Sequence, residues 1–244
     1  MKWRGFLMKT NRRKRLAFLV LLCCIFMGIK VYSKVFSKIF KHVKNPIFKQ
    51  LNRVNEIAQK TVLRSEVSLN ERVLYNFGVV RKKQLYRSAQ LPADVLDHYM
   101  KYFNIKTVIN LRGQHPEEAW WRDEKAVVER NGGTLFNISL NADRLTSKSK
   151  LLKLLEIYDT APRPILIHCL GGVDRTGEAA ALWVLEKQKK SKKRAAEQFS
   201  LFPYRHSTSK HPAKRFLIKI WQGRTWLKND YDPRHYPEFI ADVD

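Results

Sequence analysis

A glycine-containing loop between a short apolar run and a helix is the feature that most constrains this chain. Residues 165–167 (ILI) are typical of a buried strand, and residues 176–185 have the composition of a helix. The loop between them holds two adjacent glycines. Such a loop can turn several backbone N–H groups toward one point at a helix N-terminus, where the helix dipole adds partial positive charge. The segment therefore predicts an anion site.

Two side chains in this loop predict a reaction as well as binding. Cys169 lies near the start of the loop, and Arg175 follows it after five intervening residues. Backbone N–H groups and a nearby guanidinium favour the thiolate, so the pKa of Cys169 is expected below the free value of about 8.5. A guanidinium can hold two oxygens of one phosphoryl group. We expect a nucleophile and a phosphate clamp, with no metal and no other cofactor.

Residues 168–177, HCLGGVDRTG, resemble the phosphate-binding loop of the cysteine-dependent protein tyrosine and dual-specificity phosphatases. Residues 76–92 and 105–113 are similar to strands of compact bacterial and fungal dual-specificity-like members. The resemblance implies hydrolysis of phosphomonoesters through a phosphocysteine intermediate. It implies that Cys169 is the nucleophile, that Arg175 binds the phosphoryl group and that Thr176 supports the thiolate or its release. The substrate-binding residues that it implies are His168, Leu170, Gly171, Gly172 and Val173.

The leaving oxygen needs a proton, and two aspartates compete as its source. In most phosphatases of this kind the acid is an aspartate on a separate loop, and Asp143 stands in the matching place. Asp174 lies inside the loop itself, where some relatives acting on lipids carry an aspartate that serves as the acid. We favour Asp174 and keep Asp143 as the alternative.

Strands and helices alternate along the rest of the chain. Strands are expected over residues 73–80, 84–87, 107–111, 135–139 and 165–167, and helices over 92–103, 116–131, 147–158, 176–185 and 195–202. This order predicts an α/β fold with a central, mostly parallel sheet flanked by helices, as in protein tyrosine phosphatases. Ligands of such sheets lie at the carboxyl ends of the strands, so the loops after Leu111, Leu140 and Cys169 should converge.

Other polar side chains are candidates for the same site or for a metal site. Arg112 follows a predicted strand and is expected either to add charge at the mouth of the site or to be a solvated loop residue. Glu178, on the first turn of the following helix, either braces the loop or is an acid favoured by the helix dipole. His206, His211 and His235 lack the spacing of a metal site.

The N-terminal quarter has a different composition. The chain carries a net charge of +25, and residues 1–55 contain no aspartate or glutamate. A basic segment, 1–15, precedes an apolar run that begins at Leu16 and reads as an uncleaved transmembrane signal anchor over 16–32. A cleaved signal peptide and an interfacial helix are the alternatives. Residues 33–62 predict a basic amphipathic stalk, and 63–244 the catalytic domain.

These features bound the location and the partners. Basic residues on the two sides of the apolar run are nearly balanced and slightly favour an inside N-terminus, which places the catalytic domain on the non-cytoplasmic side. Anionic lipid is an expected partner of the stalk. Nucleic acid is not expected, because most of the charge asymmetry lies beside the apolar run. A phosphorylated protein and a phospholipid or phosphoinositide are both open as substrates, and a non-catalytic phosphate-binding protein is the further alternative.

Overall fold

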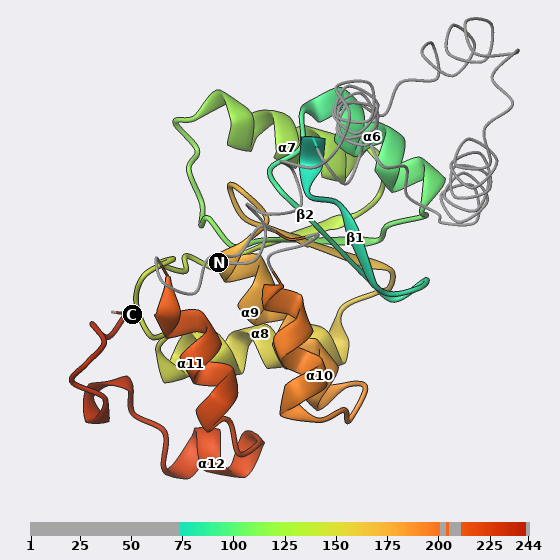
Figure 1. Cartoon of the computed structure of the whole chain (residues 1–244). Helices are drawn as coiled ribbons and strands as arrows, with labels where there is room; N and C mark the ends of the chain where they lie inside the picture. Colours follow the sequence, from blue (N-terminus) through green and yellow to red (C-terminus); the bar gives the residue numbers. More distant parts are fainter. Residues whose placement is uncertain (1–73, 201–203, 205–210, 243–244) are drawn as a thin grey trace, which may run out of the picture. The chain divides into compact units, whose positions relative to one another are not determined.

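A five-stranded sheet organises residues 74–200, 204 and 211–242, which are the part of the chain that the computed structural model describes (Figure 1). The predicted basic segment, anchor and stalk lie outside these residues, as does the expected start of the catalytic domain at residue 63. Within the described ranges, each helix is too short or too polar to cross a bilayer.

The sheet is mostly parallel, as the sequence predicts. Its strand order is β1-β2-β5-β3-β4, and only the edge strand β1 runs antiparallel to its neighbour. The strands are β1 (Gly78–Arg81), β2 (Leu85–Ser88), β3 (Thr107–Asn110), β4 (Thr134–Asn137) and β5 (Ile165–His168). Because β5 lies between β2 and β3, the loop that follows it leaves from the middle of the sheet.

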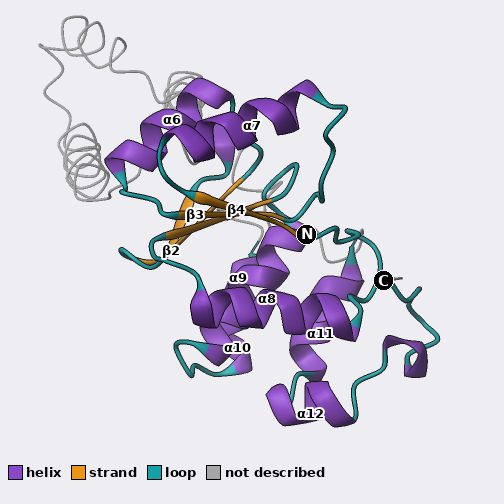
Figure 2. Ribbon diagram, turned by 180° about the vertical axis from the view of Figure 1, so that it is seen from behind, coloured by secondary structure: helices purple, strands orange, loops and turns teal. Residues whose placement is uncertain are grey.

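Helices cover both faces of the sheet. Figure 2 shows α6 (Ala93–Tyr102) and α7 (Ala119–Arg130) on one face, and the remaining labelled helices on the other. The second group comprises α8 (Lys148–Thr160), α9 (Asp174–Glu186), α10 (Lys192–Ala196), α11 (Pro212–Ile220) and α12 (Arg224–Asn229), with short 3₁₀ turns η1 (Glu197–Phe199) and η2 (Pro233–His235). All four residues of β5 are buried, as expected for a strand covered on both faces.

The first strand is shorter than its apolar sequence suggests. The expected strand over 73–80 begins only at Gly78, because Leu74 and Tyr75 are helical and Asn76 has a φ of 49°. A left-handed backbone at Asn76 interrupts an extended strand, and asparagine is one of the few residues that adopt it readily. The turn buries the Asn76 side chain, which donates from Nδ2 to the Gly172 carbonyl of the glycine-containing loop at 2.9 Å.

Helix α9 begins at Asp174, two residues before the predicted start. Its first intrahelical bond runs from Gly177 N–H to the Val173 carbonyl at 2.8 Å, so Asp174 and Arg175 lie in the first turn. No side-chain hydrogen bond caps this end. The amides of a first turn have no intrahelical acceptor, so they are available to an anion.

A buried ion pair joins α9 to α11. Lys214 Nζ lies 2.8 Å from Glu178 Oε2, and both side chains are fully buried. The Thr146 hydroxyl donates to the same carboxylate oxygen at 3.1 Å, and Lys214 donates to the Thr146 oxygen at 2.5 Å. Glu178 therefore holds α9 against α11 and the loop after β4, and these partners lie outside the loop that it was expected to brace.

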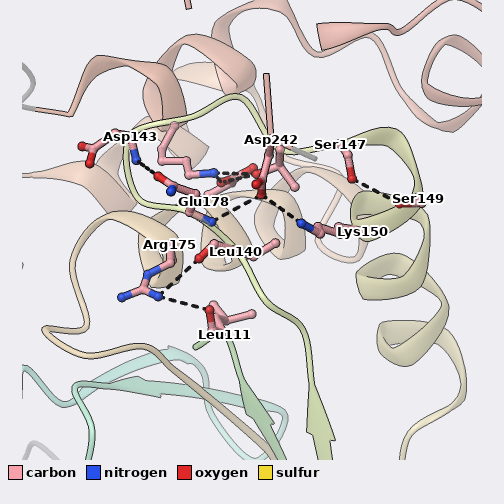
Figure 3. Close-up of polar contacts among 12 residues, drawn as sticks. Leu111, Leu140, Asp143, Ser147, Ser149, Lys150, Arg175, Glu178 and Asp242 are labelled. Carbon is pink, nitrogen blue, oxygen red and sulfur yellow. Dashed lines mark hydrogen bonds and ion pairs between the residues drawn. The ribbon is translucent and has the colours of Figure 1, made fainter. Parts of the chain in front are cut away.

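The C-terminal residues fasten the loop that follows β4. Leu145 N–H donates to the Ile240 carbonyl at 3.0 Å, and Asp242 N–H donates to the Leu145 carbonyl at 2.7 Å. The Asp242 carboxylate also pairs with Lys150 at 3.3 Å (Figure 3). Tyr231 adds a bond from its hydroxyl to the Thr146 carbonyl at 2.7 Å. The C-terminal segment is thus packed against this loop.

Candidate active site

Four parallel strands end level with one another and bring their following loops to one edge. Across the sheet, His168 at the end of β5 is in register with Ser88 of β2 and Asn110 of β3, and Asn110 is in register with Asn137 of β4. The site is therefore built where the carboxyl ends of parallel strands place ligands. The predicted convergence of the loops after β3, β4 and β5 is observed here.

Cys169 follows β5 directly and lies at the bottom of the loop, with 3% of its surface exposed. Burial by itself raises the pKa of the thiol. The charge of Arg175, the side chain of Thr176 and the N–H groups of Thr176 and Val173 outweigh burial, so the pKa of Cys169 falls below its ordinary value. The amides come from the uncapped start of α9. These groups thus favour the thiolate of Cys169 relative to that of an ordinary cysteine.

Three consecutive carbonyl groups of the loop point away from the thiol. The Leu170 carbonyl accepts from Gln90 N–H at 3.0 Å, and the Gly171 carbonyl accepts from Asn76 Nδ2 at 3.1 Å. The Gly172 carbonyl accepts from both Asn76 Nδ2, at 2.9 Å, and Arg87 Nη2, at 2.8 Å. In a trans peptide the N–H points opposite to the C=O. Holding these carbonyls outward therefore turns the next three N–H groups into the cradle.

Arg87 is the largest fully buried charged side chain of the described residues, and its role was not predicted from the sequence. It lies on β2 with no exposed surface, donates through Nη1 to the Gln198 carbonyl at 2.8 Å and stacks on the Tyr204 ring, 3.7 Å from the centroid. Burial lowers the pKa of Arg87 to about 10, against raising contributions from Tyr204 and Cys169. The guanidinium therefore stays charged at neutral pH.

Gly172 approaches β2 more closely than any side chain would allow. Its φ is +66°, and a Cβ there would lie 2.5 Å from the Ala89 nitrogen and 2.6 Å from the Ser88 carbonyl. Gly171 is different, because a Cβ there would meet only the Val173 side chain at 3.6 Å. Of the paired glycines, only the second is required by packing and backbone conformation.

The Arg175 guanidinium spans the ends of β3 and β4. Its Nη1 lies 3.4 Å from the Leu111 carbonyl oxygen and 3.3 Å from that of Leu140 (Figure 3). The buried Nε–H has no hydrogen-bond partner within the described residues. A buried donor without a partner is costly, and an oxyanion bound in the cradle would satisfy it. Arg175 is thus oriented by two loops while keeping donors for a ligand.

His168 belongs to a buried polar chain that ends at Arg112. Its Nε2 lies 2.7 Å from the Glu124 carboxylate, and Glu124 accepts from Gln90 Nε2 at 3.0 Å. Gln90 in turn accepts from Arg112 Nη1 at 3.1 Å. Burial lowers the pKa of His168, but the charge and hydrogen bond of Glu124 raise it overall. His168 is thus held by a buried carboxylate, which suits a residue that positions the loop rather than a base.

Arg112 is half-buried at the mouth and stacks on Trp120, 3.4 Å from the ring centroid. Burial and the neighbouring positive charge of Arg175 lower its pKa, whereas Cys169 and Glu124 raise it. The Arg112 guanidinium therefore lies close enough to interact electrostatically with both Arg175 and Cys169. This geometry favours the expectation that Arg112 adds charge to the site over that of a solvated loop arginine.

The two candidate acids face one imidazole. Asp143 binds His211 Nδ1 and its side chain is 66% exposed, whereas Asp174 is 14% exposed and lies 4.0 Å from His211 Nε2. From the sequence, His211 was tested only against the spacing of a metal site, which it lacks, and no other role was predicted for it. The described residues contain no group of three or more histidine, cysteine or acidic side chains arranged for a metal ion. His211 at the start of α11 is thus a site residue that the sequence did not reveal.

The paired glycines give a matched test of the cradle. Gly172→Ala should lower kcat for an aryl phosphate by about 100-fold or more, because backbone must move away from β2 and catalytic geometry is sensitive to shifts near 1 Å. Gly171→Ala should stay within a few-fold of the wild type. Similar kcat values for the two variants in steady-state assays would contradict the packing argument.

The lowered pKa of Cys169 has a measurable pH dependence. The thiolate fraction rises as the pH rises through the pKa, so iodoacetamide should alkylate Cys169 with a midpoint below that of a free thiol, about 8.5. Thr176→Ala removes an interaction that favours the thiolate and should move the midpoint to higher pH. Thr176→Ser keeps the hydroxyl and serves as the control. A wild-type midpoint at or above that of glutathione would contradict the assignment.

Parts of this chain are similar to solved structures. The crystal structure of P. aeruginosa TpbA is 22% identical over 57% of this chain and 81% of that chain, with a TM-score of 0.47. The core catalytic domain of the PP-IP phosphatase SIW14 from S. cerevisiae is 18% identical over 67% of this chain and 91% of that chain, with a TM-score of 0.49. A search of curated proteins finds no match.

A family of phosphatases matches the chain over residues 48–214, a range that includes the whole cradle and both candidate acids. The family is described as a DSP-PTPase phosphatase fused to NAD+ kinase. The match covers more than half of the sequence, and it agrees with the resemblance seen in HCLGGVDRTG. The chain belongs to this family of cysteine-dependent, dual-specificity-type phosphatases.

Proposed function

We propose that the chain hydrolyses phosphomonoesters through a phosphocysteine intermediate, with Cys169 as the nucleophile and Arg175 as the phosphoryl clamp. The observation that carries this proposal is the buried thiol whose pKa is lowered by Arg175, Thr176 and the first amides of α9. A site that only bound phosphate would gain nothing from stabilising a thiolate, so turnover is favoured over the binding alternative.

The first step transfers the phosphoryl group to sulfur. The Cys169 thiolate attacks phosphorus, a bond forms between sulfur and phosphorus, and the bond to the ester oxygen breaks. The inward N–H groups and the Arg175 donors hold the equatorial oxygens as charge redistributes, which is where preorganised donors are most effective. Arg112 adds a second positive charge at the mouth. Leu170, 60% exposed, contacts the part of the substrate beyond the phosphate.

The second role is proton transfer, which we assign to Asp174. Its carboxylic acid gives a proton to the departing ester oxygen, and the resulting carboxylate then takes a proton from the water that attacks phosphorus and releases the thiolate. Asp174 lies on the first turn of α9 and is mostly buried, as an acid next to the reacting atoms should be. The highly exposed Asp143 remains the alternative acid.

Activity of the purified chain tests these assignments. The wild type should release phosphate from an aryl phosphate in the presence of a chelator, and Cys169→Ser should abolish turnover. On an alkyl phosphate, whose leaving alcohol needs a proton, Asp174→Asn should lower kcat/KM by about 10²–10⁴-fold, the contribution of a positioned acid. Asp143→Asn is the matched control and should have the smaller effect. A larger loss in Asp143→Asn would reverse the order of the two acids, and turnover by Cys169→Ser would end the proposed mechanism.

We further propose that the enzyme is held at a membrane by residues 16–32, with its catalytic domain on the non-cytoplasmic side. The support is sequence alone: an apolar run flanked by basic residues and followed by the basic stalk, 33–62. Tethering would bring the cradle to phosphates carried by membrane proteins or by phospholipids. A phosphotyrosine or dual-specificity protein substrate is the main candidate, and a phospholipid or phosphoinositide is the alternative.

A single charge in the apolar run should detach the full chain. Leu22→Arg places an arginine near the centre of the run at a cost of about 2.5–3.5 kcal/mol, whereas Leu22→Phe keeps it apolar. We expect the Leu22→Arg protein to be absent from carbonate-washed membranes and to appear in the soluble fraction. Its activity on a soluble aryl phosphate should equal that of the wild type. Protease added to sealed vesicles of each orientation reports the side of the catalytic domain, and phosphopeptides assayed beside phospholipid vesicles report the substrate. Retention of Leu22→Arg in the washed membranes would contradict the anchor.

A further inference from the structure

His211 lies at the point where the two candidate acids meet. Its Nδ1 binds the Asp143 carboxylate, and its Nε2 lies 4.0 Å from Asp174 Oδ2. The two acids come from different loops, one after β4 and one at the start of α9. One imidazole therefore lies between both groups that compete for the same catalytic role, bonded to Asp143 and within 4.0 Å of Asp174.

The surrounding helices hold His211 in this place. It is the residue before α11, with Pro212 at the first helical position, and Lys214 three residues later forms the buried pair with Glu178. Glu178 itself follows Asp174 by four residues on α9. Residues three or four apart lie on the same side of a helix. The α9–α11 interface thus has a buried ion pair and, one turn nearer the cradle, a place where Asp174 and His211 lie 4.0 Å apart.

The loop that carries Asp143 is fixed as well. Leu145 and Thr146 are bonded to the C-terminal residues and to Tyr231 and Lys214. The imidazole accordingly lies between the loop that carries Asp143 and the start of α9, both of which are held by other bonds. Its orientation is set by the bond to Asp143. The ring then presents Nε2 to Asp174.

We propose that His211 is a positioning residue for the general acid, holding the Asp174 carboxyl group in the direction of the leaving oxygen through Nε2. The inference rests on the proposed function, because it concerns the proton donor of that reaction. His211 does not touch phosphorus or the thiol in this scheme. Its removal should therefore weaken proton donation and leave phosphoryl binding and thiolate attack intact.

Leaving groups separate proton donation from the rest of the reaction. An ester with an acidic leaving group, such as p-nitrophenyl phosphate, departs without much help, whereas an alkyl phosphate needs the acid. In the full-length enzyme, His211→Ala should lower kcat/KM for the alkyl ester by at least about 10-fold, up to the 10²–10⁴-fold that the acid supplies. The value of kcat/KM covers only the steps up to transfer of the phosphoryl group to Cys169, so for p-nitrophenyl phosphate it should stay within about two-fold.

Two amide replacements identify which nitrogen matters. His211→Gln places an amide near the position of Nε2 and should restore much of the alkyl ester activity, while His211→Asn reaches only the position of Nδ1 and should not. His98→Ala, on α6 at the opposite face of the sheet, is the control for loss of a histidine. Adding His211→Ala to Asp174→Asn should cause no further loss, because residues acting as one unit are not additive.

Each outcome is decisive. Equal losses on the two esters, full activity of His211→Ala on the alkyl ester, or rescue by asparagine and not glutamine would overturn the assignment. A wild type without turnover would instead end the proposed function, so the two failures are distinguishable. The Tm of each variant is measured beside the assays. If His211→Ala has a lowered Tm, the comparison of His211→Gln with His211→Asn tests the proposal instead.

Discussion

The hydrogen bonds to the outer side of the loop determine what the inner side can do. Arg87 and Asn76 hold the Gly172 carbonyl, and the same peptide presents the Val173 N–H to Cys169. Peptide planarity converts a bond made behind the loop into a bond made inside it. The chemistry at the thiol thus depends on a buried guanidinium from β2 and on an asparagine held in the left-handed conformation. Neither donor touches the substrate in the proposed mechanism.

The sequence predicted the parts of the site that are local in the chain. The strand, loop and helix around Cys169 are adjacent in sequence, so their order, the parallel sheet and the family were all accessible and are confirmed. Long-range partners were not. Arg87 and Gly172 lie 85 residues apart, and His211 reaches Asp143 across 68. Arginine in a strand ordinarily reads as exposed, because arginine is seldom fully buried. The start of β1 was predicted too early for a different reason. The left-handed backbone at Asn76 ends the extended conformation within an apolar run that otherwise predicts a strand.

Helix α9 combines roles that the sequence suggested were spread over a loop. Its first turn carries Asp174, Arg175 and Thr176, and the next turn carries Glu178, whose buried pair with Lys214 secures α11. An ion pair of this kind costs desolvation and is weak evidence for stability by itself. Here it fixes the separation of two helices whose ends meet at the acids. The helix therefore fixes the clamp and the proton donor relative to one another.

The two neighbouring glycines have opposite consequences for how such a loop can change over evolutionary time. Gly172 is confined by β2, so drift at that position is blocked by a strand far away in the sequence. Leu170 is exposed and Gly171 borders open space, so both can accept new side chains without moving the amides that hold the thiolate. A lineage can thus change what the rim of the cradle touches while its chemistry stays the same, and substrate preference can diverge faster than mechanism.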